Sequence, residues 1–428
     1  MVSIGNTILP GVQTNVESAS SVGVNVGAPG QIALVGQADL ESGTANKNEL
    51  KKVRTPVSAR NLFGSGSPLA ENVVGALAEG AYPVFAVATD EIDVTAEDLS
   101  GLSSTSGTLA NAPVTEDPDE VSFTIDGTDK TTIRTYNDPA DLSPGTDEAY
   151  FNPVTGAFKL DSAPSTAGDV DYSYFDYDSA VDEVIEAEGE TVDILGVINE
   201  NADAVDYAHT SVLTAASAYQ FMIVVAGAAA RIGDTSTYSN SYDSSRIQLL
   251  YPARDADDMS LIGAYAGLRA RLGINNSPMF KRLGSVTDLP ETLSPDDQQA
   301  LLAQFVVPIA NESRGARIVE DVNTVSDDNL DEASMRQVLH RLIVDYVTEV
   351  VHENSERYIG ELHTVAARNS LRSNITAELG RMMDTDSITG FNITVEKVDA
   401  MTASVDVGIN TVDPLRNIVA TISAGQTQ

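Results

Sequence analysis

Buried strands and amphipathic helices alternate along much of this 428-residue chain. Continuous apolar runs bounded by turn residues predict buried strands, and apolar residues at helical spacing predict the helices between them. The expected strands lie at residues 30–38, 83–89, 191–198 and 246–254, and the expected helices at 69–78, 202–218, 261–272 and 296–304. This order predicts an α/β layer that is built from two separated parts of the chain.

A different pattern occupies residues 91–178. Short alternating runs such as EVSFTIDG and DVDYSYFDYD are separated by turn residues, which is typical of antiparallel strands with one buried face. We predict a small antiparallel β domain that is inserted into the α/β domain. The evenly spaced Asp169, Asp171, Asp176 and Asp178 could suggest a calcium loop, but no glycine holds the required sixth position. A spacing of two favours a solvated strand.

The C-terminal region begins near Val306 and contains the most regular helical pattern. Apolar residues recur at steps of three and one from Met335 to Val351, which predicts a core helix. A second helix is expected at 355–383, with Asn354 and Ser355 breaking the helix between the two.

Two strands are expected to close this region, at 392–398 and 402–409. Val405, Val407 and Ile409 alternate with small or polar residues, which is the period of a half-buried strand. A further run, 418–422, carries neither the charge nor the proline with which soluble proteins protect an exposed strand edge. The sequence therefore raises the question of what this last run pairs with.

The charge of the chain is extreme. Lys and Arg total 25 against 63 Asp and Glu, for a net charge of -38, and the acidic residues are spread over most of the sequence. Such a surface repels itself at low salt, whereas molar salt shortens the Debye length to about 3 Å. We interpret this as adaptation to a salt-rich, archaeal cytoplasm; an acidic or calcium-rich extracellular protein is the alternative. Nucleic-acid binding is not expected, because it needs a basic face.

No catalytic, cofactor or metal site is predicted. Cysteine is absent, which excludes disulfides and thiolate chemistry, and there are only four histidines. The sequence contains no phosphate loop, nucleophile elbow or zinc-binding helix motif. The uncharged run 212–230 is near membrane-spanning length but weakly apolar, so a buried helix or a helix–strand pair is expected instead of membrane insertion.

One local contrast in charge involves the second C-terminal helix. It is expected to carry Arg357, Arg368, Arg372 and Arg381, in a chain that we interpret as otherwise lacking basic clusters. Arg368 and Arg372 share a helix face at four-residue spacing. The arginines either pair within the helix, as Arg357 could with Glu361, or dock to an acidic partner.

Taken in order along the chain, several of these segments resemble one protein family. The segments PGVQTNVES, AYPVFAVATD, YFNPVTGAFKL, RGARIVEDVNTV and VDVGINTVDPLRNIVATI are similar to those of contractile tail sheath proteins of myoviruses and related injection systems, and the resemblance spans nearly the whole chain. The stretch 314–324 departs from the family, since it lacks a bulky aromatic residue that many members have there.

The resemblance implies a mixed α/β, multidomain fold with extended arms at both ends. The expected parts are an N-terminal linking arm (1–27), an α/β domain in two parts (28–90 and 179–305), the inserted β domain (91–178), a C-terminal α+β domain facing a tube (306–412) and a C-terminal linking arm (413–428).

The resemblance also implies a structural subunit of a virion tail sheath, not an enzyme. Such subunits are expected to polymerise as stacked hexamers around a tail tube, to contact baseplate and tail terminator proteins, and to shorten in order to drive the tube through the host envelope. Assembly is expected in the host cytoplasm. The alternatives are another halophilic assembly protein, such as a capsid or S-layer component, or a halophilic enzyme.

In this family, arms from neighbouring subunits complete a sheet by strand exchange. The residues expected to do so are Val12, Thr14, Val16, Ile418, Val419, Ala420, Thr421 and Ile422. Main-chain hydrogen bonds contribute about 1 kcal/mol each, so a strand of five or six residues makes a strong joint that still lets subunits move. Arg368 and Arg372 are the expected contacts with the tube.

Overall fold

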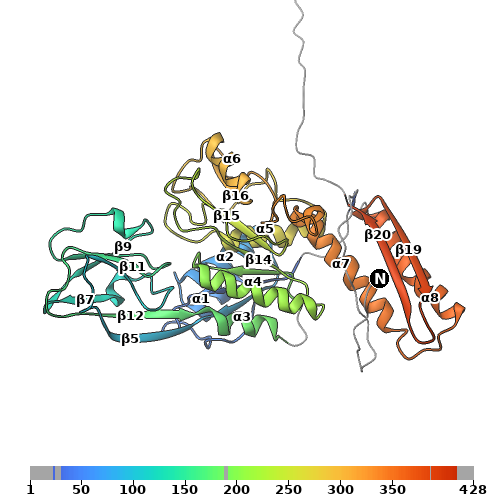
Figure 1. Ribbon diagram of the computed structural model, residues 1–428, viewed down its shortest axis with the longest axis horizontal. Coiled ribbons are helices and arrows are strands. Elements are labelled where there is room, and N and C mark those ends of the chain that lie inside the picture. Colours follow the sequence, from blue (N-terminus) through green and yellow to red (C-terminus); the bar gives the residue numbers. More distant parts are fainter. Residues whose placement is uncertain (1–22, 25–29, 188–190, 386, 412–428) are drawn as a thin grey trace, which may run out of the picture. The chain divides into compact units, whose positions relative to one another are not determined.

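The chain forms two compact units in a computed structural model that describes residues 23–24, 30–187, 191–385 and 387–411 (Figure 1). The larger unit contains Ala28–Gly273 and Pro278–Arg341, and the smaller unit contains Met1–Gly27, Ile274–Ser277 and Leu342–Gln428. One helix, α7 (Val338–Glu356), crosses the boundary in sequence. The expected division into arms and domains stays a prediction.

An eight-stranded sheet forms the centre of the larger unit. Its order is β17-β16-β15-β14-β13-β2-β4-β3, and the pairing is parallel from β16 to β4 and antiparallel at each end. The strands are β2 (Ile32–Gly36), β3 (Lys51–Val53), β4 (Val84–Ala88), β13 (Ile194–Val197), β14 (Ile223–Gly227), β15 (Ile247–Tyr251), β16 (Val306–Glu312) and β17 (Gly315–Ile318). The predicted α/β layer is confirmed.

Helices cover both faces of this sheet, which is why its central strands are apolar apart from Gln248 of β15. All residues of β2, β4, β13, β14 and β15 are buried. One face packs against α3 (Tyr177–Ile185) and α4 (Ala202–Ser217), and the other against α2 (Pro68–Glu79) and α5 (Ile262–Leu272) (Figure 1). The shorter α1 (Pro56–Phe63) packs on α2, and α6 (Pro295–Ala303) packs on β16.

Two glycines one turn apart let α5 approach α2 very closely. A Cβ at Gly263 would lie 2.2 Å from the carbonyl oxygen of Asn72, and one at Gly267 would lie 2.5 Å from that of Ala76. Real Cβ atoms do not come that near to backbone, so any side chain here would push the helices apart. Close packing of these helices therefore depends on the spacing Gly-x-x-x-Gly.

The inserted region forms two four-stranded sheets around its own core. The first has the order β5-β12-β7-β8 and the second β6-β11-β10-β9. Their strands are β5 (Asp90–Asp98), β6 (Ser106–Thr108), β7 (Ser122–Ile125), β8 (Thr128–Asp129), β9 (Thr131–Arg134), β10 (Glu148–Phe151), β11 (Ala157–Leu160) and β12 (Gly168–Asp176). Phe123 and Phe158 contact across the core, with ring centroids 5.1 Å apart. Most pairs are antiparallel as expected, but β9 and β10 are parallel.

Two long strands join this region to the eight-stranded sheet. β5 follows β4 directly, β12 leads directly into α3, and the two strands pair from Asp90 and Asp176 at the base to Asp98 and Asp169 at the far end. Asp169, Asp171 and Asp176 therefore lie on a strand, as expected, whereas Asp178 lies in the first turn of α3. These four residues do not form a calcium loop.

A buried ionic cluster fixes the base of the insertion. The Arg254 guanidinium donates to both Glu200 carboxylate oxygens, to Glu116 at 2.9 Å and to the Tyr136 hydroxyl at 2.8 Å. Glu116 and Tyr136 belong to the insertion, whereas Glu200 follows β13 of the large sheet. Burial alone would lower the pKa of Arg254, but the carboxylates of Glu200 and Glu116 hold it well above its ordinary value.

Replacing Arg254 by alanine is expected to lower the free energy of unfolding by about 3–5 kcal/mol, because the fully buried Glu200 carboxylate loses its cation. Arg231 is the matched control: it pairs with Asp258 at 2.7 Å with both side chains partly exposed, so Arg231→Ala is expected to cost about 1 kcal/mol or less. Denaturant unfolding of both variants measures the difference. Equal losses would show that the cluster is not a main support of the insertion.

The sequence places most elements of the larger unit correctly. The expected helices at 69–78, 202–218, 261–272 and 296–304 match α2, α4, α5 and α6 to within one or two residues. The uncharged run at 212–230 contains the end of α4 and all of β14, so the predicted helix–strand pair is confirmed. None of the helices that the structure describes is both long and apolar enough to span a membrane.

Candidate assembly interface

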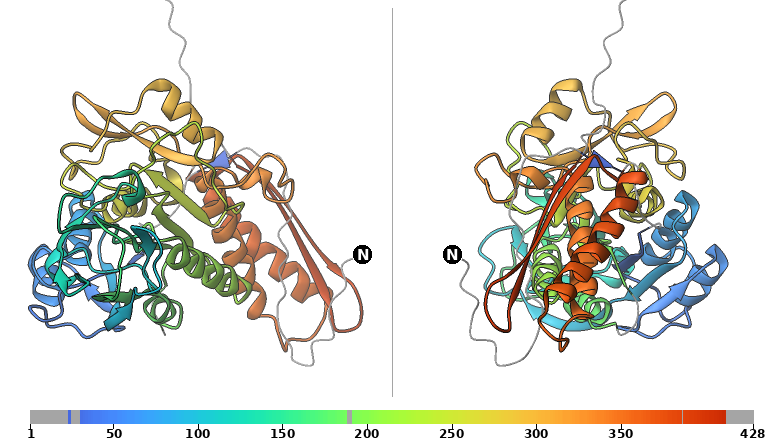
Figure 2. Two further views of the ribbon diagram at one scale, coloured as in Figure 1. Left: turned by 60° about the vertical axis from the view of Figure 1, so that its left-hand side comes forward. Right: turned by 90° about the vertical axis from the view of Figure 1, so that its right-hand side faces the viewer.

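The smaller unit consists of two helices and a long hairpin. α7 carries the predicted apolar stripe, which is buried at Val338, Ile343 and Val347 among others. α8 (Val365–Asp384) follows, then β18 (Ser387–Ile388) and the hairpin of β19 (Gly390–Lys397) and β20 (Ala403–Asn410) (Figure 2). Both strands of the hairpin were expected at nearly these positions.

Two boundaries in this unit differ from the prediction. α7 continues through Asn354 and Ser355 to Glu356, and the Asn354 side-chain amide donates to the Val350 carbonyl one turn back, at 2.8 Å. α8 starts only at Val365, where Thr364 caps it by accepting from the Ala367 N–H. The expected pairing of Arg357 with Glu361 inside a helix is therefore wrong, because both residues lie between α7 and α8.

The hairpin has one apolar face and one polar face. The pairs Phe391–Ile409, Ile393–Val407 and Val395–Val405 lie opposite one another on the apolar face. α8 packs against β19, and its buried side chains recur on one side of the helix at Leu371, Ile375, Leu379 and Met382. A two-stranded hairpin is marginal alone, so this helix supplies the burial that stabilises it.

Both outer edges of the hairpin are open within the described residues, since β19 and β20 pair only with each other there. Across the turn, the Val398 N–H donates to the Thr402 carbonyl at 3.0 Å. The pair Val398–Thr402 is therefore hydrogen-bonded. Hydrogen-bonded and non-bonded pairs alternate along an antiparallel ladder. The pair Val395–Val405 and every second pair after it are therefore non-bonded, and their backbone N–H and C=O groups point outward. The outer edge of β20 thus presents the backbone N–H groups of Val405, Val407 and Ile409 as hydrogen-bond donors.

The last described piece of the N-terminal segment lies in this same unit. β1 (Gly23–Val24) pairs with β18, with Gly23 opposite Ile388 and Val24 opposite Ser387. β18 immediately precedes the hairpin. The residues predicted for strand exchange, Val12, Thr14, Val16 and Ile418 to Ile422, lie outside the described residues, so their pairing stays a prediction.

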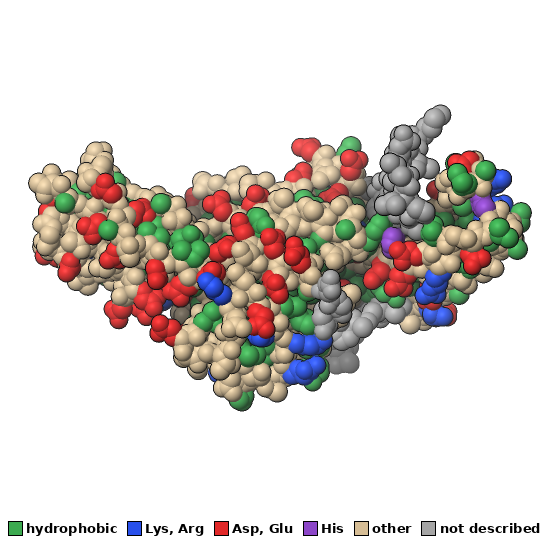
Figure 3. Space-filling view, turned by 90° about the horizontal axis from the view of Figure 1, so that it is seen from below, with side chains coloured by type: hydrophobic (Ala, Val, Ile, Leu, Met, Phe, Trp, Pro, Cys, Tyr) green, Lys and Arg blue, Asp and Glu red, His purple; other side chains and the backbone are tan. Residues whose placement is uncertain are grey.

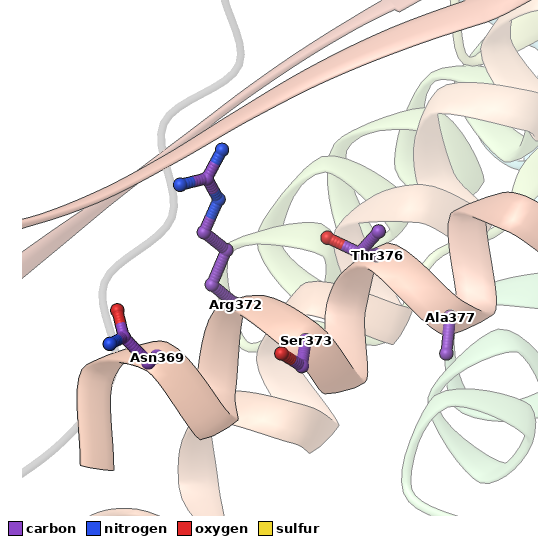
Figure 4. A pocket seen from close by; sticks show the side chains of 5 residues that line it. All are labelled: Asn369, Arg372, Ser373, Thr376 and Ala377. Carbon is purple, nitrogen blue, oxygen red and sulfur yellow. The ribbon is translucent and has the colours of Figure 1, made fainter. Parts of the chain in front are cut away.

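The two arginines predicted to contact a tube lie one turn apart on α8. Arg368 is half-buried and Arg372 is exposed, and they are the only charged residues in the first three turns of the helix. Arg372 borders a shallow hollow with Asn369, Ser373, Thr376 and Ala377, all on α8 (Figure 4). Farther along, Arg381 pairs with Glu378 at 2.6 Å, so the intrahelical alternative holds for that arginine.

Exposed apolar side chains gather at the turn end of the hairpin. Met401 is 93% exposed and Val398 56%, and on the facing segment Leu362 is 81%, Val365 64% and Ile359 47% exposed. The His363 ring bonds to the Ala400 carbonyl through Nδ1 at 3.2 Å, which joins the two segments. We call these five apolar residues the hairpin-end patch. Contiguous exposed apolar residues of this kind mark contact surfaces.

The turn that presents Met401 is ordered by Asp399. Its carboxylate accepts from the backbone N–H groups of Met401 at 2.7 Å and Thr402 at 2.8 Å. The bond from Met401 and a further bond from Thr402 hold the pKa of Asp399 below its usual value. The turn is thus fixed at neutral pH, and its exposed methionine is presented on a defined loop.

Sequence reasoning missed the hairpin-end patch because four of its members lie in loops, where no periodicity marks them, and the fifth, Val365, is the first residue of α8. It also missed a group of basic residues near the start of the chain. Lys47, Lys51, Lys52, Arg54 and Arg60 lie within fourteen residues, so the interpretation that basic clusters are otherwise lacking is wrong. A sliding count of charge would have found them.

No metal-binding arrangement of three or more His, Cys, Asp or Glu side chains occurs in the part of the chain that the structure describes. His352 lies on α7 and contacts Glu356 at 3.3 Å, whereas His363 lies beyond the end of that helix.

The acidic surface of both units is visible in Figure 3, where red side chains outnumber blue ones.

Comparison with known proteins gives a family model that matches part of the chain. Residues 172–324 match the family model of the phage tail sheath protein central domain. No curated protein sequence matches the chain.

Solved structures extend the similarity to nearly the whole chain. The baseplate structure of the anti-feeding prophage contains a chain with 13% identity and a TM-score of 0.60, which covers 98% of this chain and 100% of that chain. A chain of the contracted helical sheath of the same system has 12% identity and a TM-score of 0.60, and the match covers 97% of this chain and 99% of that chain. A sheath tail protein from Listeria innocua has 14% identity and a TM-score of 0.57, and the match covers 91% of this chain and 94% of that chain. At these identities the likeness shows the fold.

Proposed function

We propose that this protein is a structural subunit of a contractile tail sheath, because residues 172–324 match the family model of the tail sheath central domain and the chain has the fold of solved sheath proteins. Subunits polymerise as stacked hexameric rings around a tail tube. Contraction of the polymer then drives the tube through the envelope of the target cell, which delivers a genome if the tail belongs to a virus.

The observation that carries this proposal is the hairpin with two open edges in a chain of this fold. Each edge offers a row of unpaired backbone groups to an added strand. In the proposed polymer, residues 12–16 of one neighbour and 418–422 of another add to these edges. Such joints hold subunits together while still allowing them to rotate and slide.

Electron microscopy of the purified chain at high salt tests this function. Long, striated, hollow tubes are the expected product. Flat lattices or closed shells would instead indicate an S-layer or capsid protein, and discrete particles would argue against any polymer.

The net charge of -38 supports a high-salt host cytoplasm as the place of assembly. Self-repulsion of so acidic a chain opposes the close packing of copies, and salt screens it. Polymerisation is therefore expected to need molar salt, and light scattering across a salt titration measures the threshold.

Within the proposed sheath, Arg368 and Arg372 are the residues that we assign to the tube. Reversing both charges, in Arg368→Glu with Arg372→Glu, is expected to weaken co-sedimentation with tail tube polymers at least tenfold, since two cations become anions. Arg381→Glu is the control, because Arg381 is already paired with Glu378. Tube binding that survives the double reversal would remove these arginines from the contact.

A further inference from the structure

A second surface combines positive charge with exposed apolar groups, on the larger unit. It lies at one edge of the eight-stranded sheet, where β3 is the outermost strand. Val53 of β3 is opposite Val84 of β4 in an antiparallel pair, so the residues after β3 run beside those before β4. This brings the segment that starts at Arg54 next to Tyr82.

Four side chains form this β3-edge patch: Arg54, Val57, Tyr82 and Arg271. Val57 is 68% exposed and Tyr82 65% exposed. Arg271 reaches the patch from the last turn of α5, and its Cδ is 2.8 Å from where a Cβ on Gly80 would stand, two residues before Tyr82. Two distant parts of the sequence therefore supply the positive charge.

The charges of the patch differ from those of the basic residues around it. Lys47 pairs with Asp90 at 2.6 Å, and Arg60 pairs with Glu71 at 2.7 Å. Arg54 and Arg271, both exposed, have no ion-pair partner among the residues that the structure describes. Lys52 lies over the Phe85 ring, with its Nζ 4.8 Å from the centroid.

Exposed guanidinium groups beside an exposed tyrosine are the composition of a protein contact site. Arginine and tyrosine are enriched in interfaces, and a guanidinium is suited to bind carboxylates in pairs of bonds. The partner that this chemistry selects is an acidic protein surface.

The chain itself carries such a surface. Between Glu91 and Asp178 there are nineteen acidic and three basic residues. The outer strand of one sheet of this region, β5, exposes Glu91, Asp93 and Asp98. The pKa of Glu91 is raised, chiefly because its carboxyl group is partly buried, although a hydrogen bond from Ser173 opposes the rise. The neighbouring carboxylates of Glu120 and Asp93 raise this pKa further, because like charges are crowded here. A cationic side chain from a second molecule would reduce the repulsion between these carboxylates.

We propose that the β3-edge patch binds the acidic inserted β domain of a second copy of this chain. The inference rests on the proposed function, because it joins subunits within the same polymer. It adds a contact between larger units to the strand exchange of the smaller ones. Arg54 and Arg271 supply the charge, and Tyr82 and Val57 supply apolar contact that high salt does not screen.

A photo-crosslinking amino acid in place of Tyr82 tests the contact directly, since this exposed position tolerates a larger side chain. Polymers are grown from an equal mixture of isotope-labelled and unlabelled subunits, irradiated, and analysed by mass spectrometry. The expected result is crosslinks between labelled and unlabelled chains, from position 82 to residues 91–178. Crosslinks only within one chain, or to any other region or molecule, would overturn the proposal.

A charge variant gives an independent readout. Arg54→Glu with Arg271→Glu is expected to raise the concentration needed for polymerisation at least tenfold and to abolish the crosslink, whereas Arg60→Gln leaves both nearly unchanged. Circular dichroism verifies that the variants are folded. If normal polymers form without the intermolecular crosslink, only the patch assignment fails; if the unaltered chain never polymerises, the proposed function fails with it.

Discussion

Removal of residues 418–428 is expected to leave a folded, soluble monomer that no longer polymerises at any salt concentration. The deleted segment contains the apolar run IVATI, which we assign to strand exchange. Five or six main-chain hydrogen bonds at about 1 kcal/mol each would be lost at every joint, together with the burial of three large apolar side chains.

A shorter deletion is the matched control. Removing only Gly425–Gln428 leaves the apolar run intact and is expected to preserve polymerisation. Sedimentation and electron microscopy compare the two variants, and circular dichroism compares their folding. Tubes formed by the longer deletion would show that this arm is not the link between subunits.

Replacing Val405 by proline is expected to abolish polymerisation while leaving the hairpin folded. The Val405 N–H points to the outer edge of β20, so its loss removes no bond between β19 and β20. The proline ring occupies the position where a carbonyl of the added strand would bind. A block in the middle of the edge therefore prevents strand addition along its whole length.

Val405→Thr controls for the loss of the valine side chain, because threonine has nearly the same shape, suits a strand and keeps the N–H. It is expected to polymerise almost normally. Thermal unfolding of both variants separates an effect on the fold from an effect on assembly. Polymerisation of the proline variant would mean that this edge of β20 is not used.

Much of the α/β layer could be predicted from the sequence because its signals are local. Buried strands such as 84–88 are continuous apolar runs, and helices such as 295–303 begin with a serine cap followed by proline. Polar residues between β5 and β12 show a period of two, which identified the insertion. The apolar stripe of α7 likewise needed no knowledge of its packing partner.

Features that depend on contacts between distant residues could not be predicted. Arg254 joins Glu116, Tyr136 and Glu200, and nothing near any of these residues in sequence indicates the others. The predicted second helix runs through residues 357–364, but Gly360 there has a positive φ of 90° and a cap at Thr364 fixes the real beginning of α8. The β3-edge patch combines residues 54–82 with Arg271, which only the packing of α2 on α5 brings near.

The candidate site was predicted in part. The two strands of the hairpin, their half-buried apolar face and the position of Arg368 and Arg372 on a helix all follow from periodicity. That both hairpin edges are open could not be read from the sequence, because an edge is defined by which other strands are absent from the sheet. The exposed Leu362 and Met401 are loop residues and gave no pattern.

The central claim is that strands from neighbouring copies close the outer edges of this hairpin. Amide hydrogen exchange at β20, compared between monomers and polymers of the same chain, tests it most directly. We expect the outward N–H groups of Val405, Val407 and Ile409 to exchange at least a hundredfold more slowly in the polymer, while the inward Ser404 and Asp406 are protected in both states. Equal exchange of Val405, Val407 and Ile409 in monomer and polymer would contradict the account.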